Sequence, residues 1–250
     1  MLLTPLEQFQ TLSIFSFKLF FFDFSITNVI IIGLITFILF YLLLKFSQKK
    51  FSFFFIPHQW QFLLELNYDI IYSLLYDNLN KKGEKFFPFI ALIFLFITLI
   101  NLVGLVPYSF TITSHLVITL SISFSIFIGI NIICFTLYKW QMFSLFLPSN
   151  TSIGLGLLLV PIDFISYFFK PISLGVRLFA NLMAGHTLLK VIVGFAWSLL
   201  FLENLISFLH LIPLFLIILL FGLELGVALI QAYVFIILTC IYLNDSVNLH

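Results

Sequence analysis

The sequence predicts an all-α membrane protein. Its expected parts are one N-terminal transmembrane helix, a surface helix, a transmembrane helical hairpin and a long tilted helical hairpin. Apolar residues make up 62% of the 250 residues and charged residues only 8%. In soluble domains, apolar residues make up about 45–50% and charged residues about 25%. The apolar residues also gather in runs long enough to span a bilayer. We expect a single membrane domain over residues 1–250.

The first transmembrane helix is expected over 24–45, because the apolar run Ile26 to Leu44 lies between Asp23 and Lys45. The next segment, 57–80, mixes acidic and aromatic residues with apolar residues at helical spacing. That pattern is typical of a helix that lies along the membrane surface.

The transmembrane hairpin is expected over 86–138, where the chain has no Lys, Arg, Asp or Glu. Pro107 and the polar cluster Ser109 to His115 divide this stretch into two spans, roughly 86–106 and 116–138.

The long hairpin is expected over 153–243, where only Glu203 and Asn204 separate two apolar segments of about forty residues or more. A helix of that length measures about 60 Å, twice the thickness of the hydrocarbon core. Each segment must therefore split at its prolines or lie steeply tilted. No solvated loop of useful length is available for a split, so tilted helices are favoured.

The lysine-rich loops fall on one side of this topology, which the positive-inside rule makes the matrix or the cytoplasm. The N-terminal segment has no Arg-rich, acid-poor presequence, which fits synthesis inside an organelle or in a bacterium. The net charge of +1 argues against nucleic acid as a partner. No cofactor motif or metal cluster is recognised, and we expect neither.

Charged residues inside the long hairpin are the candidates for function, since a charge at the bilayer centre costs about 2.5–3.5 kcal/mol on insertion scales. They are Asp163, Lys170, Arg177, Lys190, Glu203, Glu224 and Asp245. Lys190 and Glu203 are interpreted as boundary or snorkelling residues. Arg177 and Glu224 lie deep in their segments and are interpreted as functional.

Helical spacing relates several of these positions. Arg177 and Asn181 are four residues apart and share a face, and Asp163 precedes Arg177 by about 21 Å on nearly the same face. His186 lies about 13.5 Å beyond Arg177 on another face. An arginine does not lose its proton in proteins, so Arg177 can attract a carboxylate but cannot relay protons.

Several stretches in order resemble one known family. Residues 171–190, PISLGVRLFANLMAGHTLLK, are similar to the signature of the ATP synthase subunit a family in its mitochondrial form. The tail ELGVALIQAYVFIILTCIY from Glu224 resembles the last helix of that family. TPLEQF, IPHQWQ and NLVGLVPYSFTITSH match it as well, so the resemblance covers nearly the whole chain.

The resemblance implies residue roles. Arg177 matches the family's essential arginine, which faces the ring of c subunits. The half-channel open to the intermembrane space would contain His115, Asn181, His186, Glu224 and Gln231. Asp163 and Asp245 match the acidic positions of the matrix half-channel, although Glu is the expected residue at 163.

The resemblance also implies a function and a setting. The chain would be the proton-conducting, non-catalytic stator subunit of an F-type ATP synthase in the mitochondrial inner membrane. Its two offset half-channels would load and unload protons on c-ring carboxylates. Its partners would be the c-ring, the peripheral stalk, other membrane subunits, lipid and protons, without a cofactor.

Two other functions remain open at this point. A proton-translocating subunit of a respiratory complex would carry mid-membrane Lys–Glu pairs on broken helices, whereas the central cation here is a single arginine. A structural membrane scaffold would leave the buried positions Arg177, His186 and Glu224 without an explanation. Co-purification with a ring of small two-helix subunits would separate the three functions.

Overall fold

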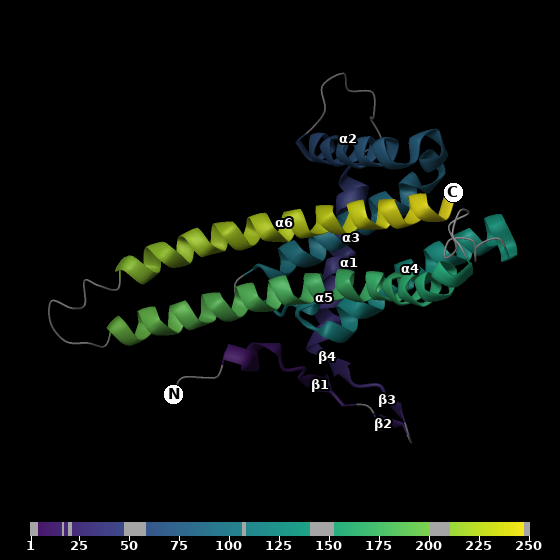
Figure 1. Cartoon of the computed structure of the whole chain (residues 1–250). Coiled ribbons are helices and arrows are strands. Elements are labelled where there is room, and N and C mark those ends of the chain that lie inside the picture. Colours follow the sequence, from purple (N-terminus) through teal and green to yellow (C-terminus); the bar gives the residue numbers. More distant parts are fainter. Residues whose placement is uncertain are drawn as a thin grey trace. The chain divides into compact units, whose positions relative to one another are not determined.

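Six α-helices form the computed structural model, which describes residues 5–16, 18–19, 22–47, 59–106, 109–140, 153–200 and 211–247 (Figure 1). The helices are α1 (Asn28–Ser47), α2 (Gln59–Leu79), α3 (Phe87–Gly104), α4 (Leu116–Tyr138), α5 (Ile153–Leu200) and α6 (Leu211–Val247). All except α2 are long and apolar enough to cross a membrane. The predicted all-α class is therefore confirmed, and five of the six helices are candidate spans. The position of α2 along the membrane surface stays a prediction.

The chain forms two compact units, and each contains three separate segments. Unit 1 comprises Met1–Phe54, Leu95–His115 and Phe179–Ala232, and unit 2 comprises Phe55–Phe94, Leu116–Leu178 and Tyr233–His250. Helices α3, α5 and α6 contribute residues to both units. A single domain over 1–250 stays a prediction.

Short strands precede α1 in unit 1, after the 3-10 turn η1 (Pro5–Phe9). The four strands are β1 (Ser13–Phe15), β2 (Lys18–Leu19), β3 (Phe22–Asp23) and β4 (Ile26–Thr27). β1 pairs with β4 and β2 pairs with β3, both antiparallel. The side chain of Asn28 bonds the backbone of Leu12 and Gln10 at 3.2 Å each. These strands, which the sequence analysis did not anticipate, make α1 begin at Asn28 instead of residue 24.

Helix α2 carries a row of aromatic side chains in unit 2. Tyr68, Tyr72 and Tyr76 stack at successive centroid distances of 6.2 and 6.3 Å, and the Phe87 ring lies 4.5 Å from that of Tyr68. The 3-10 segment η2 (Asn80–Phe86) connects α2 to α3.

The link between α3 and α4 contains a buried 3-10 turn, η3 (Ile112–Ser114). Before it, the Ser109 hydroxyl donates to the carbonyls of Val103 and Gly104 at 2.7 and 3.1 Å. These bonds satisfy backbone groups that the end of α3 leaves without a helical partner.

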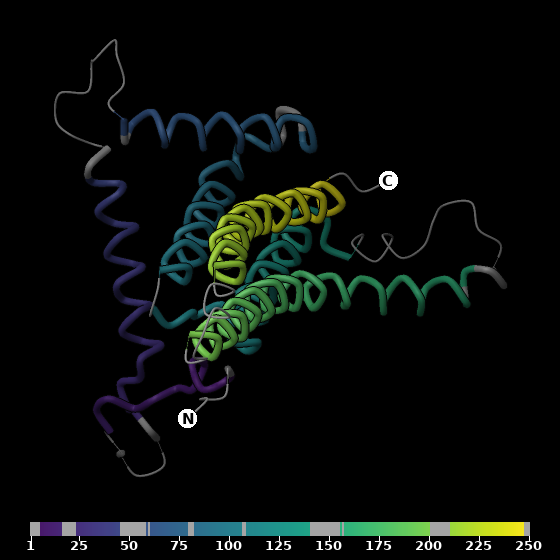
Figure 2. Tube along the Cα trace, turned by 90° about the vertical axis from the view of Figure 1, so that its left-hand side faces the viewer, coloured from purple at the N-terminus to yellow at the C-terminus, as the bar shows by residue number. Residues whose placement is uncertain are grey.

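Helices α5 and α6 contain 48 and 37 residues, which correspond to about 70 Å and about 55 Å of helix. Pro161 and Pro171 lie inside α5, yet the helix continues through both, and Figure 2 follows its trace without a break. Pro213 lies in the first turn of α6, where a proline displaces no helical hydrogen bond. Neither segment splits into two spans within the described residues, as the sequence analysis favoured.

Candidate functional site

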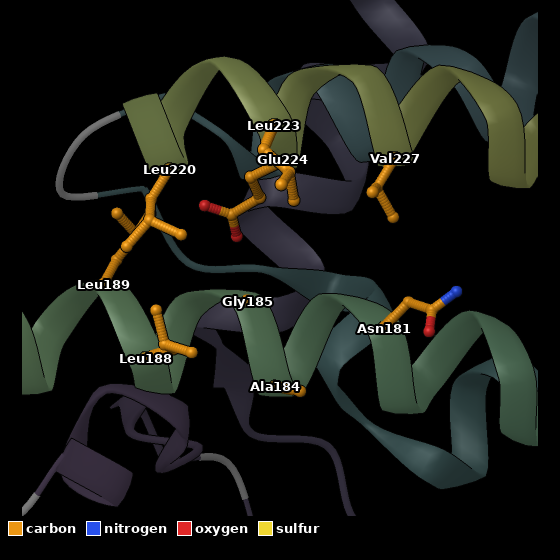
Figure 3. A pocket seen from close by; sticks show the side chains of 9 residues that line it. All are labelled: Asn181, Ala184, Gly185, Leu188, Leu189, Leu220, Leu223, Glu224 and Val227. Carbon is orange, nitrogen blue, oxygen red and sulfur yellow. The ribbon is translucent and has the colours of Figure 1, made fainter. Parts of the chain in front are cut away.

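A cavity of about 250 Å³ lies between α5 and α6 in unit 1. Its lining residues are Asn181, Ala184, Gly185, Leu188, Leu189, Leu220, Leu223, Glu224 and Val227. Figure 3 shows the Glu224 carboxylate reaching from α6 towards α5 at Gly185, with leucine side chains on one side and Asn181 on the other. One ionisable group therefore projects into an otherwise largely apolar space.

Glu224 is almost fully buried, with 5% of its surface exposed. Its nearest ionisable neighbour is His186, whose Nδ1 lies 3.4 Å from Glu224 Oε1. This separation allows an ion pair but is longer than a good N–H···O hydrogen bond. Within the part of the chain that the structure describes, neither carboxylate oxygen has a hydrogen-bond partner. A carboxyl group in this setting is stable when it holds a proton, bonds water or faces a protonated histidine.

Gly185 is the residue that makes room for this carboxyl group. A Cβ atom at position 185 would lie 2.7 Å from Glu224 Oε1 and 3.1 Å from its Cδ. Any larger side chain would therefore displace the Glu224 head group. The close approach of this carboxyl group to α5 thus depends on glycine at position 185.

Two amides bridge the same helices within unit 1. The Asn181 side chain donates to Gln231 Oε1 at 2.9 Å. Gln231 is 4% exposed, and its Nε2 has no partner among the described residues. Buried polar atoms without a protein partner commonly form hydrogen bonds to ordered water. Both Glu224 and Gln231 therefore have polar atoms that can bind water.

Asn101 of α3 is a buried polar residue that the sequence analysis missed. It is 1% exposed, and its Nδ2 donates to the Ala228 carbonyl of α6 at 3.3 Å. Ala228 lies between Glu224 and Gln231 on α6. The sequence could have indicated this contact, because an amide side chain inside an apolar span usually forms a hydrogen bond to another helix.

His115 lies in unit 1, immediately before α4. Its ring stacks on Phe110 at a centroid distance of 5.2 Å. Burial lowers the pKa of His115 from its ordinary value. The structure brings His186 and Asn181 of α5 into contact with Glu224 and Gln231 of α6, respectively. His115 has no place in the cavity lining.

The remaining predicted site residues lie in unit 2. Arg177 is exposed on α5, whereas the sequence predicted a buried position, because no other described element of unit 2 covers this face of the helix. Asp163 is half-buried on the same helix. Asp245 of α6 forms an ion pair with Lys170, with 3.2 Å between Nζ and Oδ2. Lys190 is half-exposed on the part of α5 that belongs to unit 1, and Glu203 lies outside the described residues. The partnership of Asp245 with Lys170 was not anticipated from the sequence, because the two residues are 75 positions apart.

Residues 26–244 match the sequence model of the family described as ATP synthase A chain. The chain is 50% identical to ATP synthase subunit a of Pylaiella littoralis over 251 positions, with 99% of each chain covered. It is 47% identical to ATP synthase subunit a of Chondrus crispus and 46% identical to that of Brassica napus. Each of these two comparisons covers 99% of this chain and 97% of the relative.

Proposed function

Because the chain belongs to the ATP synthase A chain family, we propose that its polar and ionisable residues form two half-channels that serve a partner ring. The family makes the chain a non-catalytic, proton-conducting subunit of the Fo stator. It crosses the membrane several times. Its similarity to algal and plant relatives supports the expected location in the mitochondrial inner membrane.

The pair of half-buried His186 and buried Glu224 beside the cavity is the observation that carries the proposal. In the proposed path, protons from the intermembrane space pass along these side chains. A histidine suits such a relay, since its ordinary titration lies near physiological pH. The Asn181–Gln231 bridge holds α5 and α6 at a fixed separation there, and His115 is proposed to lie nearer the entrance.

Arg177 is proposed to separate the two half-channels. Its guanidinium stays charged at every physiological pH. A permanent cation repels protons and attracts the ionised ring carboxylate, so a proton cannot pass from one half-channel to the other without a turn of the ring.

Asp163 and Asp245 are proposed to receive the proton that the ring releases towards the matrix. Each elementary charge that crosses the membrane supplies about 2.3 kcal/mol per 100 mV, which the ring delivers as rotation. The proposed partners are therefore the ring of c subunits, the peripheral stalk and other membrane subunits of the complex.

A double-mutant cycle on the complete ATP synthase tests the first half-channel. His186→Ala and Glu224→Gln are each expected to slow proton flux, and the double variant is expected to cost less than the sum in activation free energy. The exchanged pair, His186→Glu with Glu224→His, is expected to recover part of the flux. The matched control is Glu65→Gln on the exposed surface of α2.

Strict additivity in the cycle, with no recovery in the exchanged pair, would remove the His186–Glu224 pair from the path. Co-purification with a ring of small two-helix subunits checks the partner independently. Assembly is scored first, so that a lost flux is assigned to conduction only in complexes that contain the ring.

A further inference from the structure

A second polar cluster lies in unit 2, around the lysine to which no role has yet been assigned. Lys170 Nζ lies 3.2 Å from Asp245 Oδ2, so a cation of α5 contacts a carboxylate of α6. We propose that Lys170 is a positioning residue of the matrix half-channel, and that its ammonium holds the Asp245 carboxylate where that group accepts and passes protons. This inference rests on the proposed role of Asp245.

Two aromatic rings hold the ammonium group in place. Lys170 Nζ lies 5.3 Å from the centroid of the Tyr167 ring and 4.9 Å from that of Tyr242. Both distances fall within the roughly 6 Å at which a cation is attracted to an aromatic face. One ring comes from α5 and the other from α6, so the cation lies between rings of both helices beside its carboxylate partner.

Tyr167 is itself fixed from a third helix. Its hydroxyl donates a hydrogen bond to Asn131 Oδ1 of α4. Its ring packs against Phe127 of α4 at a centroid distance of 4.9 Å. The position of Lys170 is therefore determined by α4, α5 and α6 together, not by the flexibility of its own side chain.

The plainer interpretation is a lysine that extends to water near a helix end. The geometry argues against it, because the side chain of Lys170 is only 30% exposed and its ammonium meets a carboxylate and two rings. The Asp245 side chain keeps 44% exposure. One oxygen can thus contact the ammonium while the carboxylate remains accessible to water, as a group that exchanges protons must be.

Lys170 also differs from Arg177, which lies seven residues later on the same helix and close to the same face. Arg177 is exposed, whereas Lys170 already has its carboxylate within unit 2. The two cations would therefore have different roles. Arg177 meets a carboxylate that arrives from outside the chain, and Lys170 orients one that belongs to the chain.

The test uses the complete ATP synthase in sealed vesicles, with proton flux normalised to assembled enzyme. Lys170→Gln is expected to slow flux about two- to fivefold, because partly exposed ion pairs contribute modestly. Lys170→Arg is expected to restore most of the flux. In an Asp245→Asn background, Lys170→Gln is expected to cause no further loss. Lys190→Gln, also on α5, is the matched control.

The outcomes separate this inference from the proposed function. If Asp245→Asn slows flux and Lys170→Gln does not, the role of Lys170 alone is wrong. If Asp245→Asn leaves flux unchanged, the assignment of Asp245 to the half-channel is wrong, and the role of Lys170 is wrong with it. An equal loss from Lys170→Gln in both backgrounds would show that Lys170 acts independently of Asp245.

A second variant covers the case in which Lys170→Gln does not assemble. Tyr242→Leu removes one ring from the ammonium and leaves both charges in place. We expect a smaller loss of flux that disappears in the Asp245→Asn background. The same loss in both backgrounds would contradict the inference.

Discussion

Glycine at position 185 decides where the Glu224 carboxyl group can lie. Glu224 Oε1 lies so close to the backbone of α5 at Gly185 that a Cβ atom added there would be only 2.7 Å from this oxygen. Real Cβ atoms do not tolerate such a distance, so the head group would have to turn away from α5 and from His186.

We therefore expect Gly185→Ala to lower proton flux by between about tenfold and about a hundredfold, the range that small displacements of reacting groups can cost. Gly226→Ala on α6 is the matched control, because a Cβ there meets no described atom within 4 Å. Flux in assembled complexes is the measurement. Equal flux in both variants would mean that the position of Glu224 is not critical.

Arg177 is the only arginine in the sequence, within a long apolar helix. Arg177→Ala is expected to abolish proton-driven ATP synthesis and to leave assembly largely intact. Arg177→Lys should also fail, because a compact ammonium lacks the planar geometry with which a guanidinium meets a carboxylate. Synthesis rates in reconstituted enzyme provide the check, and normal synthesis by either variant would contradict the role.

At the scale of the element, the length of α5 sets its orientation in the membrane. Its 48 residues exceed the roughly 20 residues that an upright helix needs to cross the hydrocarbon core. A helix that is continuous through two prolines can fit only by tilting or by extending far beyond the core. The structure excludes the other alternative, a split into two spans.

Spin labels placed along α5 should therefore report a lipid-exposed stretch much longer than about 20 residues. Helix α4, with 23 residues, is the internal control and should give a stretch of ordinary length. The depth of each label in the membrane is measured by comparing its accessibility to oxygen with its accessibility to a water-soluble relaxation agent. A stretch of ordinary length in α5 would show an upright helix that protrudes from the bilayer.

At the scale of the whole molecule, the lysines at the ends of three elements should face one side of the membrane. All three lysines are exposed. Lys45 lies in the last turn of α1, Lys85 precedes α3 and Lys139 follows α4. The positive-inside rule places them on the matrix side. Single cysteines at these positions should react with an impermeant thiol reagent in inverted vesicles only.

Thr11→Cys is the control for the other side, since the N-terminal segment is expected to face the intermembrane space. The native Cys134 and Cys240 are fully buried and should give little background. Labelling of Lys45→Cys and Thr11→Cys from the same side would refute the orientation.

The sequence by itself determined the fold class, because lipid is the only solvent that tolerates so few charges, and hydrogen-bonded helices are the simplest way to cross it. It also singled out Arg177, His186 and Glu224, since ionisable residues in apolar helices are costly. It could not decide which residues meet across helices. The contact of Glu224 with Gly185 and the pairing of Lys170 with Asp245 depend on the relative rotation and register of α5 and α6. Packing between helices fixes that register, and local sequence patterns do not contain it.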